Sequence, residues 1–267
     1  MTDRYAVIGH PVAHSMSPRI HAEFARATGH AIEYQRIEAP LDGFARTVDE
    51  FRAAGARGAN VTLPFKAQAF DYCRGEVGPE ARAAQVVNTL IFEKGGVRGE
   101  NTDGVGLLRD ITRNLGRAIA GQRVLLMGAG GAARGVLAPL LAAGPRSLVI
   151  ANRDVGKARS LARNGGAAAG IGYGDLGGAR FDLLINATSA SLAGEALPLP
   201  AAAFAPGALA YDMVYGGDTP FLAMARAAGA EARDGTGMVV EQAAESFLLW
   251  RGVRPDTAAL IAVLCPR

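Results

Sequence analysis

Apolar runs alternate with amphipathic segments through the first quarter of the chain. Short runs rich in Ala, Val and Ile predict β-strands, and segments whose apolar residues recur every three or four positions predict helices. The predicted strands are Arg4–Gly9, Ile32–Ile37 and Gly58–Leu63, and the predicted helices are Ser17–Thr28 and Gly43–Ala54. This βαβαβ order is typical of a parallel or mixed sheet with helices on its faces.

Polar residues and prolines mark the boundaries of several elements. Ser17 is expected to cap the first helix, with Pro18 at its first helical position, because that position needs no N–H. Farther on, we expect a helix, a short helix or turn, a hairpin, and a polar turn that opens a helix to Asn114. These segments are Phe65–Cys73, Gly78–Ala84, Val86–Phe92 paired with Val97–Gly99, and Glu100–Gly104.

The stretch Arg123–Arg153 has the pattern of a dinucleotide-binding unit. A strand at Val124–Met127 meets a glycine-rich turn, a helix follows to Ala143, and Leu148–Ala151 is the next strand. Gly-rich turns also serve plain chain reversal, but the flanking strand and helix favour the nucleotide interpretation. In the turn, glycine permits unusual backbone angles and close approach to a pyrophosphate, and the helix N-terminus attracts phosphate. The turn residues expected at the cofactor are Gly128, Gly130, Gly131 and Ala132.

Asn152-Arg153 follows the second strand of this unit. An acidic residue there would suit the ribose 2′-hydroxyl of NAD, whereas Arg153 suits the 2′-phosphate of NADP. Asp154 has two interpretations: the N-cap of a helix at Val155–Arg163, which we favour, or a carboxylate that repels the 2′-phosphate. Lys157 either restores positive charge or is simply solvated.

Later strands are predicted at Leu183–Asn186, Leu209–Met213 and Glu231–Arg233, separated by the loop-like Gly165–Gly178 and Gly194–Gly207. Two terminal helices, Met238–Trp250 and Asp256–Leu264, have no later strand to cover. We therefore expect an α/β fold of two domains. A discontinuous substrate domain comprises residues 1–103 and 237–267, and a Rossmann-like NADP-binding domain comprises residues 104–236.

Composition narrows the class of protein. Of 267 residues, 49% are hydrophobic, and the formal net charge is +3 with scattered Lys and Arg, so no nucleic-acid partner is expected. We find no signal peptide pattern and no apolar stretch of membrane-spanning length. Cys73 and Cys265 form neither a disulfide framework nor a zinc pattern, so we expect a cytoplasmic protein without a metal.

Polar residues also gather at the ends of the predicted strands of the first domain, where open α/β sheets bind ligands. They are Ser15, Ser17, Asn60, Thr62, Lys66, Asn88 and Asp103. Each has an ordinary structural explanation, such as a helix cap or a satisfied backbone group. Their convergence favours a binding site.

Eight motifs together resemble the shikimate dehydrogenase family over nearly the whole chain. They are HSMSP (14–18), NVTLPFK (60–66), VVNTL (86–90), NTDG (101–104), GAGGAARG (128–135), INATS (185–189), DMVY (212–215) and GMVVEQAAESFLLW (237–250). The resemblance implies NADPH-dependent reduction of 3-dehydroshikimate to shikimate, in aromatic amino acid biosynthesis, by a monomer or homodimer.

The resemblance also implies a role for individual residues. Lys66 and Asp103 correspond to the catalytic pair, and Ser15 and Ser17 to the serines that bind the substrate carboxylate. Residues implied for the ring hydroxyls are Thr62, Asn88 and Gln242, and those implied for the rest of the substrate and cofactor site are Asn152, Arg153, Tyr215, Gly237 and Met238. Lys157 is a cofactor candidate on its charge alone. A lysine beside a ketone can stabilise the alkoxide that forms and donate the proton.

The chain departs from the family pattern at three positions. Met16 replaces a frequent Lys, Asp154 a common Thr, and Gly217 a usual Pro. Because of Asp154, one alternative is a family member that also uses quinate and NAD. A second alternative is a non-catalytic regulator that binds a related metabolite. Retention of both Lys66 and Asp103 argues against the regulator, because a binding protein needs neither.

Overall fold

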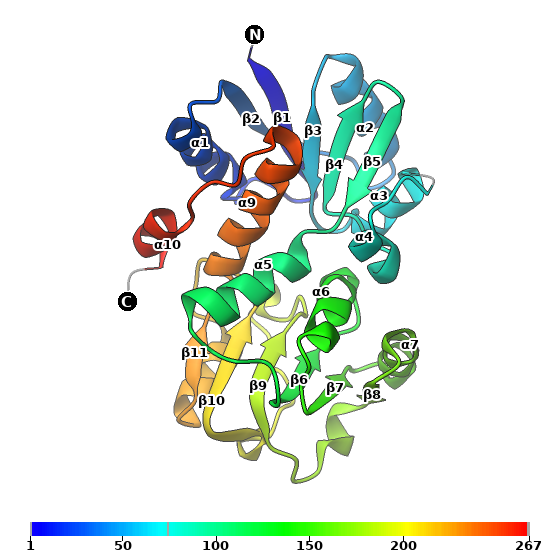
Figure 1. Cartoon of the computed structure of the whole chain (residues 1–267). Helices are drawn as coiled ribbons and strands as arrows, with labels where there is room; N and C mark the ends of the chain where they lie inside the picture. The colour runs from blue at the N-terminus through cyan, green and yellow to red at the C-terminus, as the bar shows by residue number, and fades with distance from the viewer. Residues whose placement is uncertain (1, 74, 266–267) are drawn as a thin grey trace. The chain divides into compact units, whose positions relative to one another are not determined.

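Figure 1 shows the computed structural model, which describes residues 2–73 and 75–265. The chain forms two compact units, one of Met1–Gly106 with Val239–Arg267 and the other of Leu107–Met238. The divisions expected after residues 103 and 236 fall within helices α5 (Asp103–Arg109) and α9 (Thr236–Arg251), slightly before the chain changes unit. The two-domain α/β class expected from the sequence is confirmed.

The first unit is built on a five-stranded mixed sheet of order β2-β1-β3-β4-β5. Its strands are β1 (Asp3–Gly9), β2 (Ile32–Glu38), β3 (Gly58–Val61), β4 (Thr89–Glu93) and β5 (Gly96–Glu100). The first three run parallel, and β4 and β5 add an antiparallel hairpin. The carboxyl ends of β1 and β3 therefore meet at one edge of the sheet, with the loops that follow them.

Successive residues of β1 point to opposite sides of the sheet, so both faces carry apolar side chains, and helices cover both faces. Ala6 and Ile8 pack with Phe44 of α2, whereas Tyr5 stacks on Trp250 of α9 with ring centroids 4.6 Å apart. The helices of this unit besides α9 are α1 (Ser17–Thr28), α2 (Phe44–Ala53), α3 (Lys66–Tyr72), α4 (Pro79–Ala84) and α10 (Ala258–Leu264). The terminal helices α9 and α10 pack with α1 in one apolar cluster, as expected.

The start of α1 differs from the prediction. The N-cap is Met16, without a side-chain cap, and Ser17 is the first helical residue, so the expected serine cap is wrong by one position. The Ser15 hydroxyl accepts a hydrogen bond from the Ser17 N–H at 3.3 Å, which satisfies the first N–H of the helix.

The second unit contains a six-stranded parallel sheet of order β11-β10-β9-β6-β7-β8. Its strands are β6 (Arg123–Met127), β7 (Ser147–Ala151), β8 (Ala168–Ile171), β9 (Phe181–Asn186), β10 (Phe204–Asp212) and β11 (Glu231–Arg233), and its helices include α6 (Gly131–Ala142), α7 (Val155–Gly165) and α8 (Pro220–Ala227). The chain builds outward from β6 to β8 and then returns to place β9 on the other side of β6. This reversal between β6 and β9 is the topological switch point at which such sheets bind nucleotides.

Strand β8 contradicts the prediction that Gly165–Gly178 is a loop. Its sequence, Ala168-Ala169-Gly170-Ile171, has little intrinsic preference for a strand. Small residues are needed here because α7 packs closely on the strand: a Cβ on Gly170 would lie 2.5 Å from the backbone of Ala158 in α7. Pairing with β7 and close helix packing therefore create a strand that the local pattern does not indicate.

The helix expected to run to Asn114 changes its hydrogen-bonding pattern partway. Helix α5 ends at Arg109, and Asp110–Asn114 forms a π-helical turn. The N–H of Leu115 donates to the Asp110 carbonyl, five residues back, as a π-turn requires.

The N-cap predicted for α7 is confirmed, because the Asp154 side chain accepts a hydrogen bond from the Lys157 N–H at 3.1 Å.

Candidate active site

Lys66 and Asp103 form an ion pair in the first unit. The Nζ of Lys66 lies 2.6 Å from Oδ2 of Asp103, and their side chains are 14% and 6% exposed. Lys66 is the first residue of α3, just after β3, and Asp103 is the first residue of α5, just after β5. The pair is therefore partly shielded from water, where a charged hydrogen bond is stronger than in bulk solvent.

Asn88 fixes the orientation of the Asp103 carboxylate. Its Nδ2 donates to Asp103 Oδ1 at 2.8 Å and to Thr102 Oγ1 at 2.9 Å. Its Oδ1 accepts from the Thr102 N–H at 2.9 Å, which ties the start of α5 to the segment before β4. One carboxylate oxygen thus bonds the amide while the other bonds Lys66, so the carboxylate plane is fixed by both.

The same network continues onto α9. Gln242 Oε1 lies 3.4 Å from Asn88 Nδ2 and 3.3 Å from the Thr102 hydroxyl. The Ser246 hydroxyl lies one turn farther along α9, 2.9 Å from the Thr89 hydroxyl and 2.9 Å from Asn60 Nδ2. Thr102, Thr89 and Ser246 were not singled out from the sequence. The i,i+4 spacing of Ser246 from Gln242 was the available signal.

The serines predicted to bind a carboxylate are adjacent and buried. Ser15 Oγ lies 3.2 Å from Ser17 Oγ, and the two residues are 6% and 5% exposed. Thr62 follows β3 and is half-buried, and within the described part of the chain its hydroxyl has no hydrogen-bond partner. The first unit therefore places hydroxyls, amides and the ion pair on segments that leave the ends of its strands.

The glycine turn of the second unit has the geometry that a pyrophosphate needs. Gly128 has φ of 108°, and a Cβ there would lie 3.0 Å from the Ala187 carbonyl oxygen, so a larger residue is excluded. Gly130 is the N-cap of α6 without a side-chain cap, and a Cβ on it would meet nothing within 4 Å. The first N–H groups of α6, which begins at Gly131 and Ala132, are therefore available to an anion.

Arg153 stands beside this turn, because Gly128 N–H donates to the Ala151 carbonyl at 2.8 Å and Arg153 follows two residues later. Its side chain is 80% exposed and lies 3.8 Å from Glu195. Asn152 Nδ2 donates to the Asp154 carbonyl at 3.0 Å, which fixes the turn between them. Lys157 lies 4.0 Å from the Asp154 carboxylate and is largely solvated. The donors present at the turn fit NADP.

Three further predicted residues belong to the second unit. Tyr215 is half-buried in the loop after β10, and Gly237 and Met238 lie in the first turn of α9. Met238 packs in the apolar core cluster that includes residues of α6, so its side chain contributes to the core of this unit. These residues belong to a different unit from the Lys66–Asp103 pair.

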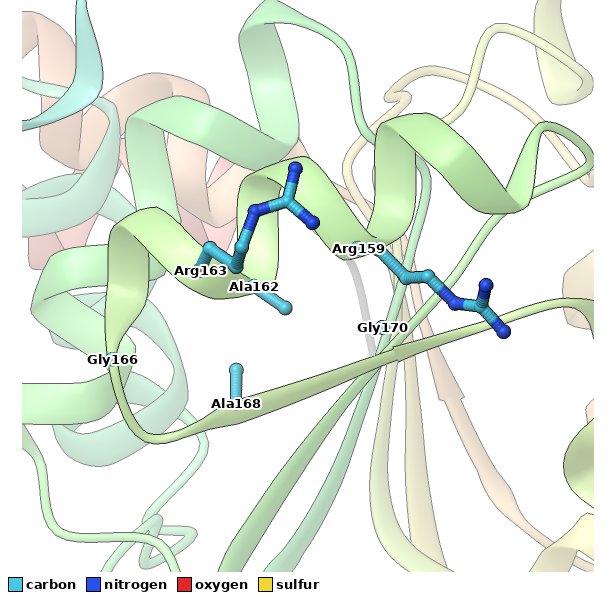
Figure 2. Close-up of a pocket in the computed structure, with 6 residues that line it drawn as sticks. All are labelled: Arg159, Ala162, Arg163, Gly166, Ala168 and Gly170. Carbon is cyan, nitrogen blue, oxygen red and sulfur yellow. The ribbon is translucent and has the colours of Figure 1, made fainter.

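Figure 2 shows a pocket of about 310 Å³ in the second unit, between α7 and β8. Arg159 and Arg163 line it, and their guanidinium groups extend in different directions. Its lining contains none of the predicted site residues. In residues 2–73 and 75–265 no cluster of potential metal ligands is found, and no helix has the length and hydrophobicity to span a membrane.

Comparison with known proteins agrees with this arrangement. Family models described as the shikimate dehydrogenase substrate binding domain, shikimate / quinate 5-dehydrogenase, and the shikimate 5′-dehydrogenase C-terminal domain match residues 7–90, 110–193 and 235–265. The three matches follow the chain in order and cover more than half of it.

Individual relatives match along nearly their full lengths. A shikimate dehydrogenase (NADP⁺) of Aromatoleum aromaticum is 60% identical, with 98% of this chain and 96% of the relative covered. Its counterpart in Methylobacillus flagellatus is 56% identical, with 98% of each chain covered. A crystal structure of the Thermus thermophilus shikimate 5-dehydrogenase with NADP(H) and shikimate has a TM-score of 0.87 at 36% identity, with 97% of each chain covered. The chain therefore belongs to the shikimate dehydrogenase family.

Proposed function

We propose that this chain catalyses the reversible, NADP-dependent interconversion of shikimate and 3-dehydroshikimate, with Lys66 and Asp103 as the catalytic pair. The observation that carries the assignment of these residues is their contact, 2.6 Å between Nζ and Oδ2 in a largely buried setting. A protonated amine and a carboxylate held together in this way can exchange a proton with a substrate oxygen.

In the reducing direction, the glycine turn would hold NADPH, which would supply the hydride that the ketone carbon accepts. The substrate oxygen then gains negative charge, and the Lys66 ammonium stabilises that charge and donates the proton. Asp103 keeps Lys66 in place and accepts a hydrogen bond from the neighbouring ring hydroxyl. In the oxidising direction, the same pair removes the proton of the alcohol.

Binding of the ring divides between two groups of residues. The Ser15 and Ser17 hydroxyls are proposed to bind the carboxylate, supported by their proximity and burial. Thr62, Asn88, Tyr215 and Gln242 are proposed to bind the ring hydroxyls and line the site. The free Thr62 hydroxyl supports its part, whereas the Asn88 amide already bonds Asp103 and therefore also positions the catalytic carboxylate.

NADP is the proposed cofactor, with the glycine turn at the pyrophosphate and Arg153 at the 2′-phosphate. The high exposure of Arg153 supports this role, because its guanidinium is available to a ligand. Asp154 is engaged as a helix cap, so its carboxylate is directed to backbone rather than to the ribose. Gly237 and Met238 are proposed to lie at the nicotinamide. We further propose a cytoplasmic monomer or homodimer.

The test is a spectrophotometric assay of NADPH formation by purified protein, with shikimate or quinate and with NADP⁺ or NAD⁺. We expect the highest kcat/KM for shikimate with NADP⁺. Comparable values for quinate and NAD⁺ would instead identify a dehydrogenase of broader specificity. Binding of shikimate without turnover of either alcohol would favour the regulatory alternative.

A further inference from the structure

Arg36 holds the main chain of the loop that carries Ser15. Its Nε and Nη2 groups both donate to the Ser15 carbonyl oxygen, at 3.0 and 2.6 Å. Arg36 lies on β2, the edge strand of the first sheet, in register with Val7 of β1. The loop that follows β1 is therefore fixed by a side chain from the neighbouring strand.

The positive charge of Arg36 is not neutralised locally. Among the residues that the structure describes, no carboxylate lies within 4.0 Å of its guanidinium. The two acids of β2 have other partners, since Glu33 lies 3.9 Å from Arg4 and Glu38 lies 3.7 Å from His10. Arg36 thus bonds a neutral carbonyl and keeps a net charge beside the serine loop.

That loop contains no permanently charged cation of its own. Residues 10–18 include two histidines, His10 and His14, but no Lys or Arg, and Met16 stands between the two serines. Ser15 and Ser17 are buried and bond each other through their hydroxyls. Hydroxyl groups orient a carboxylate but carry no net charge, so a cation nearby adds discrimination for an anion.

We propose that Arg36 is a positioning and specificity-determining residue that makes the serine loop select an ionised carboxylate over a neutral group of the same shape. This inference rests on the proposed function, in which Ser15 and Ser17 bind the substrate carboxylate. Arg36 acts through Ser15: its two N–H groups fix the carbonyl, and its charge favours the anion at the adjacent hydroxyls.

The two contributions can be separated by substitution. R36Q removes the charge, whereas R36K keeps the charge but loses the two-pronged contact with the Ser15 carbonyl. For a charge roughly 6–8 Å from an anion at an effective dielectric of about 40–80, the expected change in affinity is about three- to tenfold. K94Q is the control, because Lys94 is exposed in the turn between β4 and β5, away from the serine loop.

The experiment measures the Kd of shikimate and of its neutral methyl ester by calorimetry, and kcat with shikimate and NADP⁺, for the wild type and these variants. We expect R36Q to weaken shikimate binding about three- to tenfold, to change ester binding less than twofold, and to leave kcat and the KM for NADP⁺ within about twofold. R36K should retain the preference for the acid over the ester, and K94Q should behave as the wild type.

The outcomes separate this inference from the proposed function. If the wild type oxidises shikimate and R36Q binds acid and ester as the wild type does, or loses both equally, the inference on Arg36 is wrong while the function stands. If the wild type does not oxidise shikimate, the proposed function fails first. Should R36Q fold poorly, salt provides a second measurement on the wild type and R36K. Both should lose shikimate affinity with rising ionic strength while ester affinity stays constant, and salt-independent shikimate binding contradicts the inference.

Discussion

The Tyr211 hydroxyl donates a 2.6 Å hydrogen bond to Oδ2 of Asp110 inside the second unit. Tyr211 is fully buried, and burial together with the Asp110 carboxylate raises the pKa of its hydroxyl well above the usual value. Asp110 begins the π-helical turn after α5, and its other oxygen accepts from Asn114 Nδ2. The side chain of a central strand thus anchors the turn that follows the helix of Asp103.

Replacing Tyr211 with Phe should destabilise the protein by about 1.5–3 kcal/mol, because the buried Asp110 carboxylate loses a donor that water cannot replace. Tyr173→Phe is the matched control: its hydroxyl is buried without a partner in the described structure, so its removal should cost nothing. Urea unfolding at pH 7 measures both. Equal destabilisation by the two substitutions would contradict the importance of the Tyr211–Asp110 contact.

A methyl group on Gly237 should also disturb this contact. A Cβ there would lie 2.0 Å from Oδ1 of Asp110, so the carboxylate or the start of α9 must move. We expect Gly237→Ala to lower the free energy of unfolding by about 1–3 kcal/mol, as overpacking does. Gly174→Ala, which would meet no atom within 4 Å, should leave stability unchanged. Wild-type stability of Gly237→Ala would show that Asp110 moves aside freely.

Replacing Lys66 with Ala should lower kcat roughly 10²–10⁴-fold with little change in KM, because the proton donor and charge partner are lost together. Lys94→Ala, at an exposed hairpin position, removes the same charge far from the ion pair and serves as the control. Steady-state assays at saturating NADP⁺ measure kcat. A near-normal kcat for Lys66→Ala would remove this residue from the mechanism.

Substitution of Arg153 with Ala should weaken NADPH far more than NADH, by about 10- to 100-fold in KM, since a charged hydrogen bond to the 2′-phosphate is lost. Measuring both cofactors with the same variant controls for misfolding, because misfolding would weaken NADPH and NADH alike. Equal losses for NADPH and NADH would mean that Arg153 does not recognise the 2′-phosphate.

Stability should fall in acid because of His21. The ring is fully buried and stacks on Tyr34, with ring centroids 4.3 Å apart. Burial lowers its pKa to about 3, so the folded state stays neutral where the unfolded chain, with a pKa near 6.5, takes up a proton. Since the unfolded state binds more protons, stability declines as pH falls from about 6.5 toward 3, by about 1.4 kcal/mol per unit.

His21→Leu should remove that contribution from the pH dependence of unfolding, measured by urea titration between pH 4 and 7. His14→Gln, at an exposed position, should leave the dependence unchanged. An identical slope in the wild type and His21→Leu would mean that other groups dominate acid unfolding.

Features that depend only on residues close together in the sequence could be predicted. The glycine turn at Gly128 and the Asp154 cap depend on backbone angles and hydrogen bonds within a few residues, and both were predicted. The apolar periodicity of the strands and helices was sufficient for the two-domain class. The resemblance added roles for Lys66 and Asp103 that spacing alone does not indicate.

Other features depend on segments that are distant in the sequence. Strand β8 forms because β7 offers it an edge, and Ser246 joins the network because α9 packs against the sheet that carries Thr89. The helix α1 begins one residue earlier than expected, with Met16 as its N-cap and the Ser17 N–H bonded to Ser15. The sequence by itself determined local backbone preference and the apolar pattern. The tertiary structure decided which polar groups meet, because a buried donor takes whichever acceptor the packing places beside it.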